Sequence, residues 1–338
     1  MPKLDALLAT LTQVATEPKL DGPFKTTPPK AVRYAEKTPA WFVVPDVSQH
    51  PPIENTHTAV VLVSARAAVG KSTAAAFIAD KLAAPLWDLS KLSVGHGFVA
   101  GTLIDTYNPA RVPDLLKKLA IGEFAIVIDA LDEARIHGGI PNQLDLLMDD
   151  VAACCGTTAR IGPSFVMLGR VDTCGVAAEK LTSLGVPFSR VEVQYFDEVD
   201  ARDFILRRLD SLGHTAHRGT PAQARDFKAA LSAVFDGVVK AMNVSPASPW
   251  NDVELRRFLG YAPVLVAVAM YLKGWVDYKA MLADWHRKAV TGDQWQVLCK
   301  IMNALLEREQ IDKFRFNAEG RITAKLKPGE ILQWPRLL

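Results

Sequence analysis

The chain of 338 residues lacks several features that would place it in a specialised class. It holds only four cysteines, Cys154, Cys155, Cys174 and Cys299, and none has the CxxC or Cys/His spacing of a zinc site. So few cysteines in a chain of this length suit a reducing cytosol, and we expect a cytoplasmic protein. The formal net charge is only +2, so no strong field favours nucleic acid or an anionic membrane surface.

Long apolar runs are also missing. The longest one, from Tyr261 to Leu272, falls well short of the roughly 20 residues that a membrane span needs, and it predicts a core helix. The N-terminus carries a charge inside its apolar stretch and lacks the pattern of a secretory signal. We therefore expect no membrane association. A hydrophobic content of 49% with 22% charged residues fits a globular protein with a full-sized core.

The most informative stretch covers residues 59–77, AVVLVSARAAVGKSTAAAF. It opens with an unbroken apolar run that predicts a buried parallel strand, and it closes with good helix formers. Between them the residues GKST at 70–73 match the end of a phosphate-binding P-loop. Backbone N–H groups at a helix N-terminus form an anion site. Lys71 would add a charge for the β- and γ-phosphates, and the Ser72 hydroxyl can bind Mg²⁺.

This P-loop departs from the usual pattern at two positions. Ala65 stands where the pattern begins with glycine, and Ala68 stands where many such loops have one. Alanine is the smallest substitute, but it is strained at positive φ where glycine is not. Taken alone, the stretch is also compatible with an ordinary strand–turn–helix that carries a surface lysine. The residues expected to contact a nucleotide here are Ala65, Arg66, Ala67, Ala68, Val69, Gly70, Lys71, Ser72 and Thr73.

A second apolar strand, FAIVID at 124–129, ends in the carboxylate of Asp129. An acidic residue at the tip of a buried strand is costly unless it meets a cation or a donor. The Mg²⁺ of a nucleotide bound at the P-loop is the natural partner, so we expect Ser72 and Asp129 to hold the metal. Asp132 and Glu133 follow just beyond the strand, where one of them could orient a water for attack on the γ-phosphate. The sequence does not decide between the two, although we prefer Glu133.

These residues carry a resemblance to a known family. IVIDALDEA resembles the Walker B motif of the STAND class of P-loop NTPases, and it is most similar to the NACHT branch. That pattern is four hydrophobic residues, Asp, a small residue, a hydrophobic residue and Asp-Glu. Plain AAA+ proteins place Glu directly after the Asp, where this chain has Ala130. The resemblance covers roughly residues 58–310 and implies a nucleotide-dependent molecular switch. ATP is favoured over GTP because no guanine-selecting NKxD motif is evident.

Further apolar segments at 85–90, 164–170 and 190–194 predict three more strands. Arg170 ends the second of these. The resemblance implies that this strand lies beside the P-loop strand, and that Arg170 senses the γ-phosphate and stabilises transition-state charge. A surface arginine at a strand end is the alternative. Strands alternating with helices predict an α/β fold, a parallel sheet of five strands with helices on both faces and the ligand outside the strands' carboxyl ends.

The pattern divides the chain into four parts. Residues 1–57 form an N-terminal helix at 4–15 and a proline-rich extension, with a short strand or extended segment at 41–45. Residues 58–196 form the P-loop domain, and 311–338 form a C-terminal hairpin. An all-α domain covers 197–310, with helices expected at 198–211, 222–243, 252–272, 277–289 and 294–309. The resemblance implies that Pro263, in a GxxP sequence similar to a STAND motif, packs near the adenine. A helix kink or a first-turn proline is the equally weighted alternative.

The resemblance implies a slowly hydrolysing ATPase switch that uses Mg²⁺ and binds nucleotide between the sheet and the helical domain. It makes a role in anti-phage or innate defence, or in signalling, plausible, with protein partners or self-association. Two other functions stay open. If Ala65 and Ala68 weaken nucleotide binding, the chain could be a non-hydrolysing scaffold. It could also be an AAA+-like DNA-associated ATPase, but its near-neutral charge without a basic stripe weighs against direct nucleic-acid binding.

Overall fold

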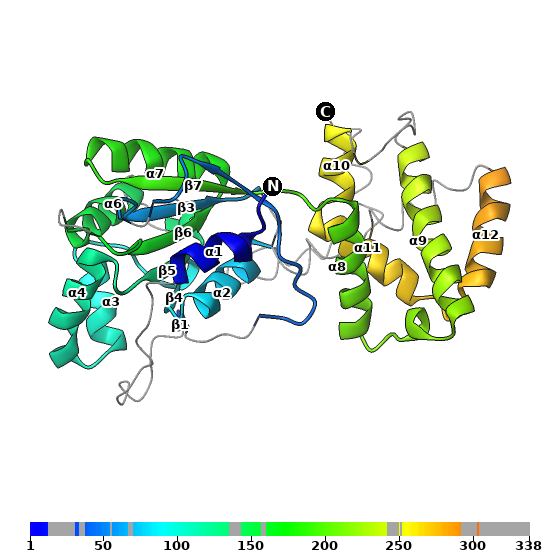
Figure 1. Cartoon of the computed structure of the whole chain (residues 1–338), viewed down its shortest axis with the longest axis horizontal. Coiled ribbons are helices and arrows are strands. Elements are labelled where there is room, and N and C mark those ends of the chain that lie inside the picture. The colour runs from blue at the N-terminus through cyan, green and yellow to red at the C-terminus, as the bar shows by residue number, and fades with distance from the viewer. Residues whose placement is uncertain are drawn as a thin grey trace, which may run out of the picture. The chain divides into compact units, whose positions relative to one another are not determined.

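The computed structural model describes residues 1–12, 31–33, 38–54, 56–66, 70–134, 143–156, 160–241, 250, 252–291 and 303. The chain divides into two compact units, Met1–Gln194 and Tyr195–Leu338, whose elements are labelled in Figure 1. Three expectations lie largely or wholly outside the described residues. They are the P-loop positions Ala67, Ala68 and Val69, the helix at 294–309 and the hairpin at 311–338.

A seven-stranded sheet forms the centre of the first unit, in the order β1-β4-β5-β6-β3-β7-β2. The five inner strands run parallel to one another. They are β3 (Val60–Ser64), β4 (Leu86–Asp88), β5 (Ile126–Asp129), β6 (Phe165–Gly169) and β7 (Phe188–Val193). Every residue of the first four is buried, which is why each appears in the sequence as a continuous apolar run.

The prediction of a five-stranded sheet was wrong, because the first 57 residues supply two more strands. β1 (Val32–Arg33) pairs antiparallel with β4, and β2 (Val47–His50) pairs antiparallel with β7. β1 has only two residues, and β2 reads VSQH. Neither has the apolar run or clear alternation that reveals a strand in a sequence. The segment at 41–45 forms no strand; the strand in this region begins at Val47.

Helices cover both faces of the sheet, as predicted. The alternation of a strand sends Val61 and Val63 to one face and Leu62 to the other. The first face is covered by α1 (Leu4–Thr12) and α2 (Lys71–Lys81). The second face is covered by α3 (Phe98–Thr106), α4 (Val112–Ile121), α6 (Gln143–Cys154) and α7 (Val171–Ser183). Short helices η1 (Leu89–Lys91), η2 (Pro109–Arg111) and α5 (Leu131–Ala134) complete the unit.

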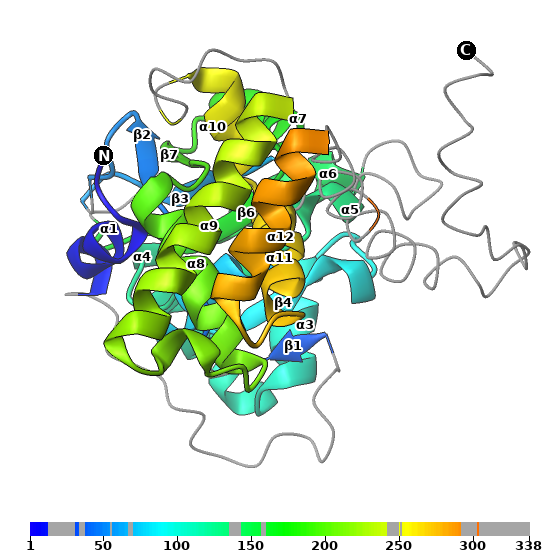
Figure 2. The ribbon, with the colours of Figure 1, turned by 90° about the vertical axis from the view of Figure 1, so that its right-hand side faces the viewer.

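The second unit is built from helices throughout its described part. These are α8 (Glu198–Ser211), η3 (Ala216–Arg218), α9 (Pro221–Ala241), α10 (Val253–Leu259), α11 (Ala262–Lys273) and α12 (Tyr278–Thr291). Figure 2 shows α9 and α12 side by side, and α8 packs on α11. The single helix expected at 252–272 is two helices, because Gly260 ends α10 and Pro263 lies in the first turn of α11.

Within the described residues, no single helix is long and apolar enough to cross a membrane. α10 and α11 together satisfy the length and composition of a span, but the pair is bent by 55°. Most apolar residues of α11, including Val264, Leu265 and Val268, are buried inside the unit. The run from Tyr261 to Leu272 is therefore a core helix, as its length predicted.

Candidate functional site

Polar residues follow the carboxyl ends of four neighbouring parallel strands. In the strand register, Ser64 of β3 is paired with Gly169 of β6, and Asp88 of β4 is paired with Asp129 of β5. Because parallel strands end at one edge, Arg170 is brought to the edge at which the P-loop begins. The expectation that the strand ending at Arg170 lies beside the P-loop strand is confirmed.

The structure describes the P-loop residues on either side of positions 67–69: Ala65 and Arg66 follow β3, and Gly70 precedes α2. Ala65 is buried, and its N–H donates to the carbonyl of Gly169 at 3.0 Å. Arg66 is exposed. Gly70 is the N-cap of α2 and adopts the left-handed conformation, with φ 85°, which favours glycine. Lys71, Ser72 and Thr73 are the first three residues of the helix, where N–H groups have no partner in their own helix and favour anions.

Asp132 joins the two cationic residues of this edge. Its Oδ2 lies 2.7 Å from Nζ of Lys71 and 3.6 Å from Nε of Arg170. Its Oδ1 accepts a hydrogen bond of 2.6 Å from the backbone N–H of Arg170. The Lys71 and Asp132 side chains are only 15% and 12% exposed, whereas Arg170 is 54% exposed. A single carboxylate thus holds the predicted phosphate-binding lysine and the predicted γ-phosphate sensor together.

Asp129 is the most buried acid of the edge, at 3% exposure. Burial raises the pKa of its carboxyl above the ordinary value, and the nearby charge of Asp88 adds to the rise. A hydrogen bond from the Ser72 hydroxyl, the Ala130 N–H and the charge of Lys71 oppose it. Among the described residues, no cation lies within ion-pair distance of Asp129. A buried carboxylate beside a hydroxyl, both oxygen donors, fits Mg²⁺, which would supply the missing positive charge.

Glu133 lies one residue beyond Asp132 in α5. Its N–H donates to the carbonyl of Ala130 at 2.9 Å, and its side chain is half-buried. Ala130 itself has a left-handed φ of 62°, which is strained for a residue with a Cβ. This turn changes the direction of the chain between the buried strand and α5. The structure therefore brings Asp129, Asp132 and Glu133 to one edge with different partners.

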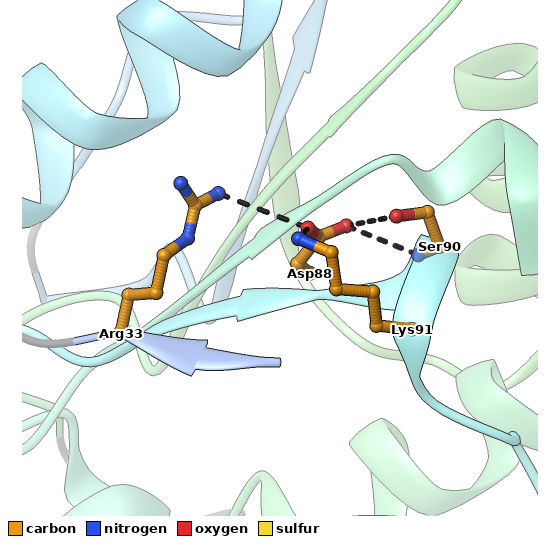
Figure 3. A network of polar contacts seen from close by, with 4 residues as sticks. All are labelled: Arg33, Asp88, Ser90 and Lys91. Carbon is orange, nitrogen blue, oxygen red and sulfur yellow. Dashed lines mark hydrogen bonds and ion pairs between the residues drawn. The ribbon is translucent and has the colours of Figure 1, made fainter. Parts of the chain in front are cut away.

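Asp88 was missed by the sequence analysis, although it ends the buried strand next to that of Asp129. Figure 3 shows its carboxylate surrounded by Arg33, Ser90 and Lys91. Oδ1 accepts hydrogen bonds from the Ser90 hydroxyl at 2.6 Å and its N–H at 3.2 Å. Oδ2 accepts one of 2.6 Å from Lys91 and lies 3.9 Å from Arg33. The signal that could have revealed it is the one used for Asp129, a carboxylate at the end of an apolar strand.

Pro263 is buried in the first turn of α11, in the second unit. This is one of the two local roles that the sequence allowed. Its contact with an adenine ring stays a prediction.

Comparisons with known proteins return little. No protein-family model matches the chain, and no curated protein matches it. Among solved structures, the chain is similar to a Walker-type ATPase of Pyrococcus abyssi, with 14% sequence identity and a TM-score of 0.43. The match covers 77% of this chain and 72% of that one.

Proposed function

We propose that the chain is an ATP-binding, Mg²⁺-dependent P-loop NTPase that hydrolyses nucleotide slowly. The observation that carries the proposal is the position of Lys71. It begins a helix behind a left-handed glycine, next to a buried aspartate that lacks a direct cation among the described residues. An anion site and a cation site thus lie side by side at the carboxyl edge of a parallel sheet, as a Mg²⁺-bound triphosphate requires.

The residues at the carboxyl edge of the sheet would have different roles in nucleotide binding and hydrolysis. The N–H groups at 70–73 and the Lys71 ammonium would bind the phosphates. Ser72 and Asp129 would hold Mg²⁺, which when bound neutralises phosphate charge. Arg170, exposed at the end of β6, would approach the γ-phosphate. Glu133, the half-buried acid that the sequence pattern favours over Asp132, would orient the attacking water.

The resemblance of residues 126–134 to the NACHT pattern supports the finer proposal. In it the chain is a STAND-type switch with protein partners or self-association, in a defence or signalling system. Nucleotide binding would change the conformation and so the surfaces offered to those partners. ATP is the proposed nucleotide because the chain has no NKxD sequence. DNA is not a proposed ligand, since the formal net charge is only +2.

Nucleotide binding by the wild type and Lys71→Ala tests the proposal. Mg-ATP at a hundredfold excess over Kd should add about 2.7 kcal/mol to the free energy of unfolding of the wild type, and should therefore raise its melting temperature. Lys71→Ala should show no such rise. Lys81→Ala, an exposed lysine at the other end of the same helix, should behave as the wild type. A wild type that binds no adenine nucleotide at any Mg²⁺ concentration would overturn the proposal and favour the scaffold alternative.

A further inference from the structure

We propose that Asp88 is a positioning residue of this site, whose negative charge strengthens Mg²⁺ binding by the neighbouring Asp129. The inference rests on the proposed function, because it concerns the metal that accompanies the nucleotide. It goes beyond it by assigning a role to a residue outside the P-loop and Walker B segments.

The register of the sheet brings the two carboxylates together. Asp88 and Asp129 are paired residues of the parallel strands β4 and β5. Neighbouring strands lie about 4.8 Å apart, and side chains of paired residues point to the same face. Both residues are buried, at 7% and 3% exposure. Two carboxylates are thus held close together in surroundings that screen their charges poorly.

Hydrogen bonds hold the Asp88 carboxylate in place. Oδ1 accepts one of 2.6 Å from the Ser90 hydroxyl, and Oδ2 accepts one of 2.6 Å from the Lys91 ammonium, a donor that favours the charged form. These contacts fix the carboxylate in one orientation next to Asp129.

The capping role of Asp88 does not by itself need the charge. Asp88 is the N-cap of the short helix η1, a position that Asn or Ser fills equally well. In the ligand-free protein the two buried carboxylates, side by side in the sheet, repel each other. A divalent cation at Asp129 reverses the sign of this effect, since a second nearby negative charge then attracts it. Apart from its ion pairs with Lys91 and Arg33, the Asp88 charge gains a favourable partner only when the metal is present.

Lys91 and Arg33 reduce the charge of Asp88 only in part. Their side chains are 49% and 31% exposed, so solvent screens both cations more than it screens the buried carboxylate of Asp88. Lys91 therefore works against the metal while it holds Asp88 in place. Removal of the Lys91 side chain should therefore strengthen Mg²⁺ binding, whereas removal of the Asp88 charge should weaken it.

The test is a Mg²⁺ titration of ATP binding, measured by calorimetry at fixed ATP, with an arm in excess EDTA. Asp88→Asn keeps a capping oxygen and removes the charge. We expect it to raise the half-saturating Mg²⁺ concentration about tenfold, with no loss of the metal-free binding seen in EDTA. Asp114→Asn removes an exposed acid from α4, and its half-saturating Mg²⁺ concentration should equal that of the wild type.

Lys91→Ala provides a second test that does not depend on the folding of Asp88→Asn. It should lower the half-saturating Mg²⁺ concentration. Asp88→Asn that folds with the wild-type Mg²⁺ requirement overturns the inference, as does Lys91→Ala that leaves this requirement unchanged or raises it. These outcomes are distinct from failure of the proposed function. In that case the wild type itself would bind no ATP with or without Mg²⁺.

Discussion

Nζ of Lys71 lies 2.7 Å from Oδ2 of Asp132, although the two residues are 61 positions apart in the chain. The Asp132 carboxylate forms an ion pair with the Lys71 ammonium, which the proposed function assigns to the β- and γ-phosphates. It also accepts a hydrogen bond from the N–H of Arg170. A triphosphate bound in the proposed way would have to replace the contact between Asp132 and Lys71. Asp132 and nucleotide phosphate are therefore expected to compete for Lys71.

Asp132→Asn should consequently bind ATP more tightly than the wild type. The amide keeps an oxygen that can accept from the Arg170 N–H, but it removes the charge that attracts Lys71. We expect a several-fold fall in the Kd for Mg-ATP, because breaking a partly buried ion pair no longer opposes binding. Equilibrium binding of a fluorescent ATP analogue measures the change. Weaker binding by this variant would mean that Asp132 supports the nucleotide rather than competing with it.

Glu133→Gln is the matched change one residue further on, and it should separate binding from hydrolysis. If Glu133 orients the attacking water, the glutamine variant should bind ATP as the wild type does but hydrolyse it at least about 100-fold more slowly. Single-turnover phosphate release measures the rate. Wild-type hydrolysis by Glu133→Gln, together with loss of hydrolysis in Asp132→Asn, would assign the water to Asp132 instead.

Asp129→Asn should change the pH dependence of stability in the absence of nucleotide and metal. Burial raises the pKa of Asp129 in the folded protein, so the folded state binds its proton more tightly than the unfolded state does. The stability that this proton contributes is present below the unfolded pKa and is lost as pH rises through the folded pKa. We expect the variant to melt at a higher temperature than the wild type at neutral pH.

The advantage of Asp129→Asn should shrink as the pH falls below the folded pKa, where the wild-type carboxyl is protonated as well. Melting curves of both proteins, recorded between pH 4 and pH 8 in steps of about one pH unit, measure the difference between their melting temperatures. Titratable groups that both proteins share contribute equally to the two curves and drop out of this difference. Mg-ATP should stabilise only the wild type, since the variant lacks the metal-binding charge. A variant less stable than the wild type at neutral pH without ligand would contradict this account of Asp129.

Gly237 and Gly175 should respond to alanine with opposite signs. A Cβ on Gly237 of α9 would lie 2.2 Å from Cζ2 of Trp285, a buried ring of α12 that cannot move without repacking. Gly237→Ala should therefore destabilise the helical unit by about 1–3 kcal/mol. Gly175 lies inside α7 with nothing within 4 Å of its Cβ position, so Gly175→Ala should stabilise the protein by about 0.5–1 kcal/mol. Urea unfolding of the two variants measures both.

The sequence predicted the inner part of the first unit well, and the reason is burial. Strands covered on both faces must be apolar along their length, so the runs around Val61, Val127 and Val166 could be recognised without any structure. The polar residue after each run then had to lie at the shared carboxyl edge. Lys71, Asp129 and Arg170 were located by this reasoning, and the structure places all three there.

The contacts within the edge were not predictable in the same way. Whether Asp132 or Glu133 turns towards Lys71 depends on the left-handed backbone of Ala130, which no residue type signals, because alanine rarely adopts it. Asp88 was missed because the strand predicted at 85–90 continued to Ser90, which placed the aspartate inside the strand, whereas β4 ends at Asp88 and a short helix follows. Its pairing with Asp129 follows from the register, which depends on the whole sheet.

The two antiparallel strands of the first 57 residues have a consequence for how the domain can be produced and shortened. β1 pairs with β4 and β2 pairs with β7, and these are the two outermost strands of the parallel part of the sheet. The first 57 residues therefore supply the edge strand on both sides. A version starting at residue 58 would keep every residue of the predicted P-loop domain. It would nevertheless expose the backbone donors and acceptors along β4 and β7, which could pair with those of another copy and cause aggregation.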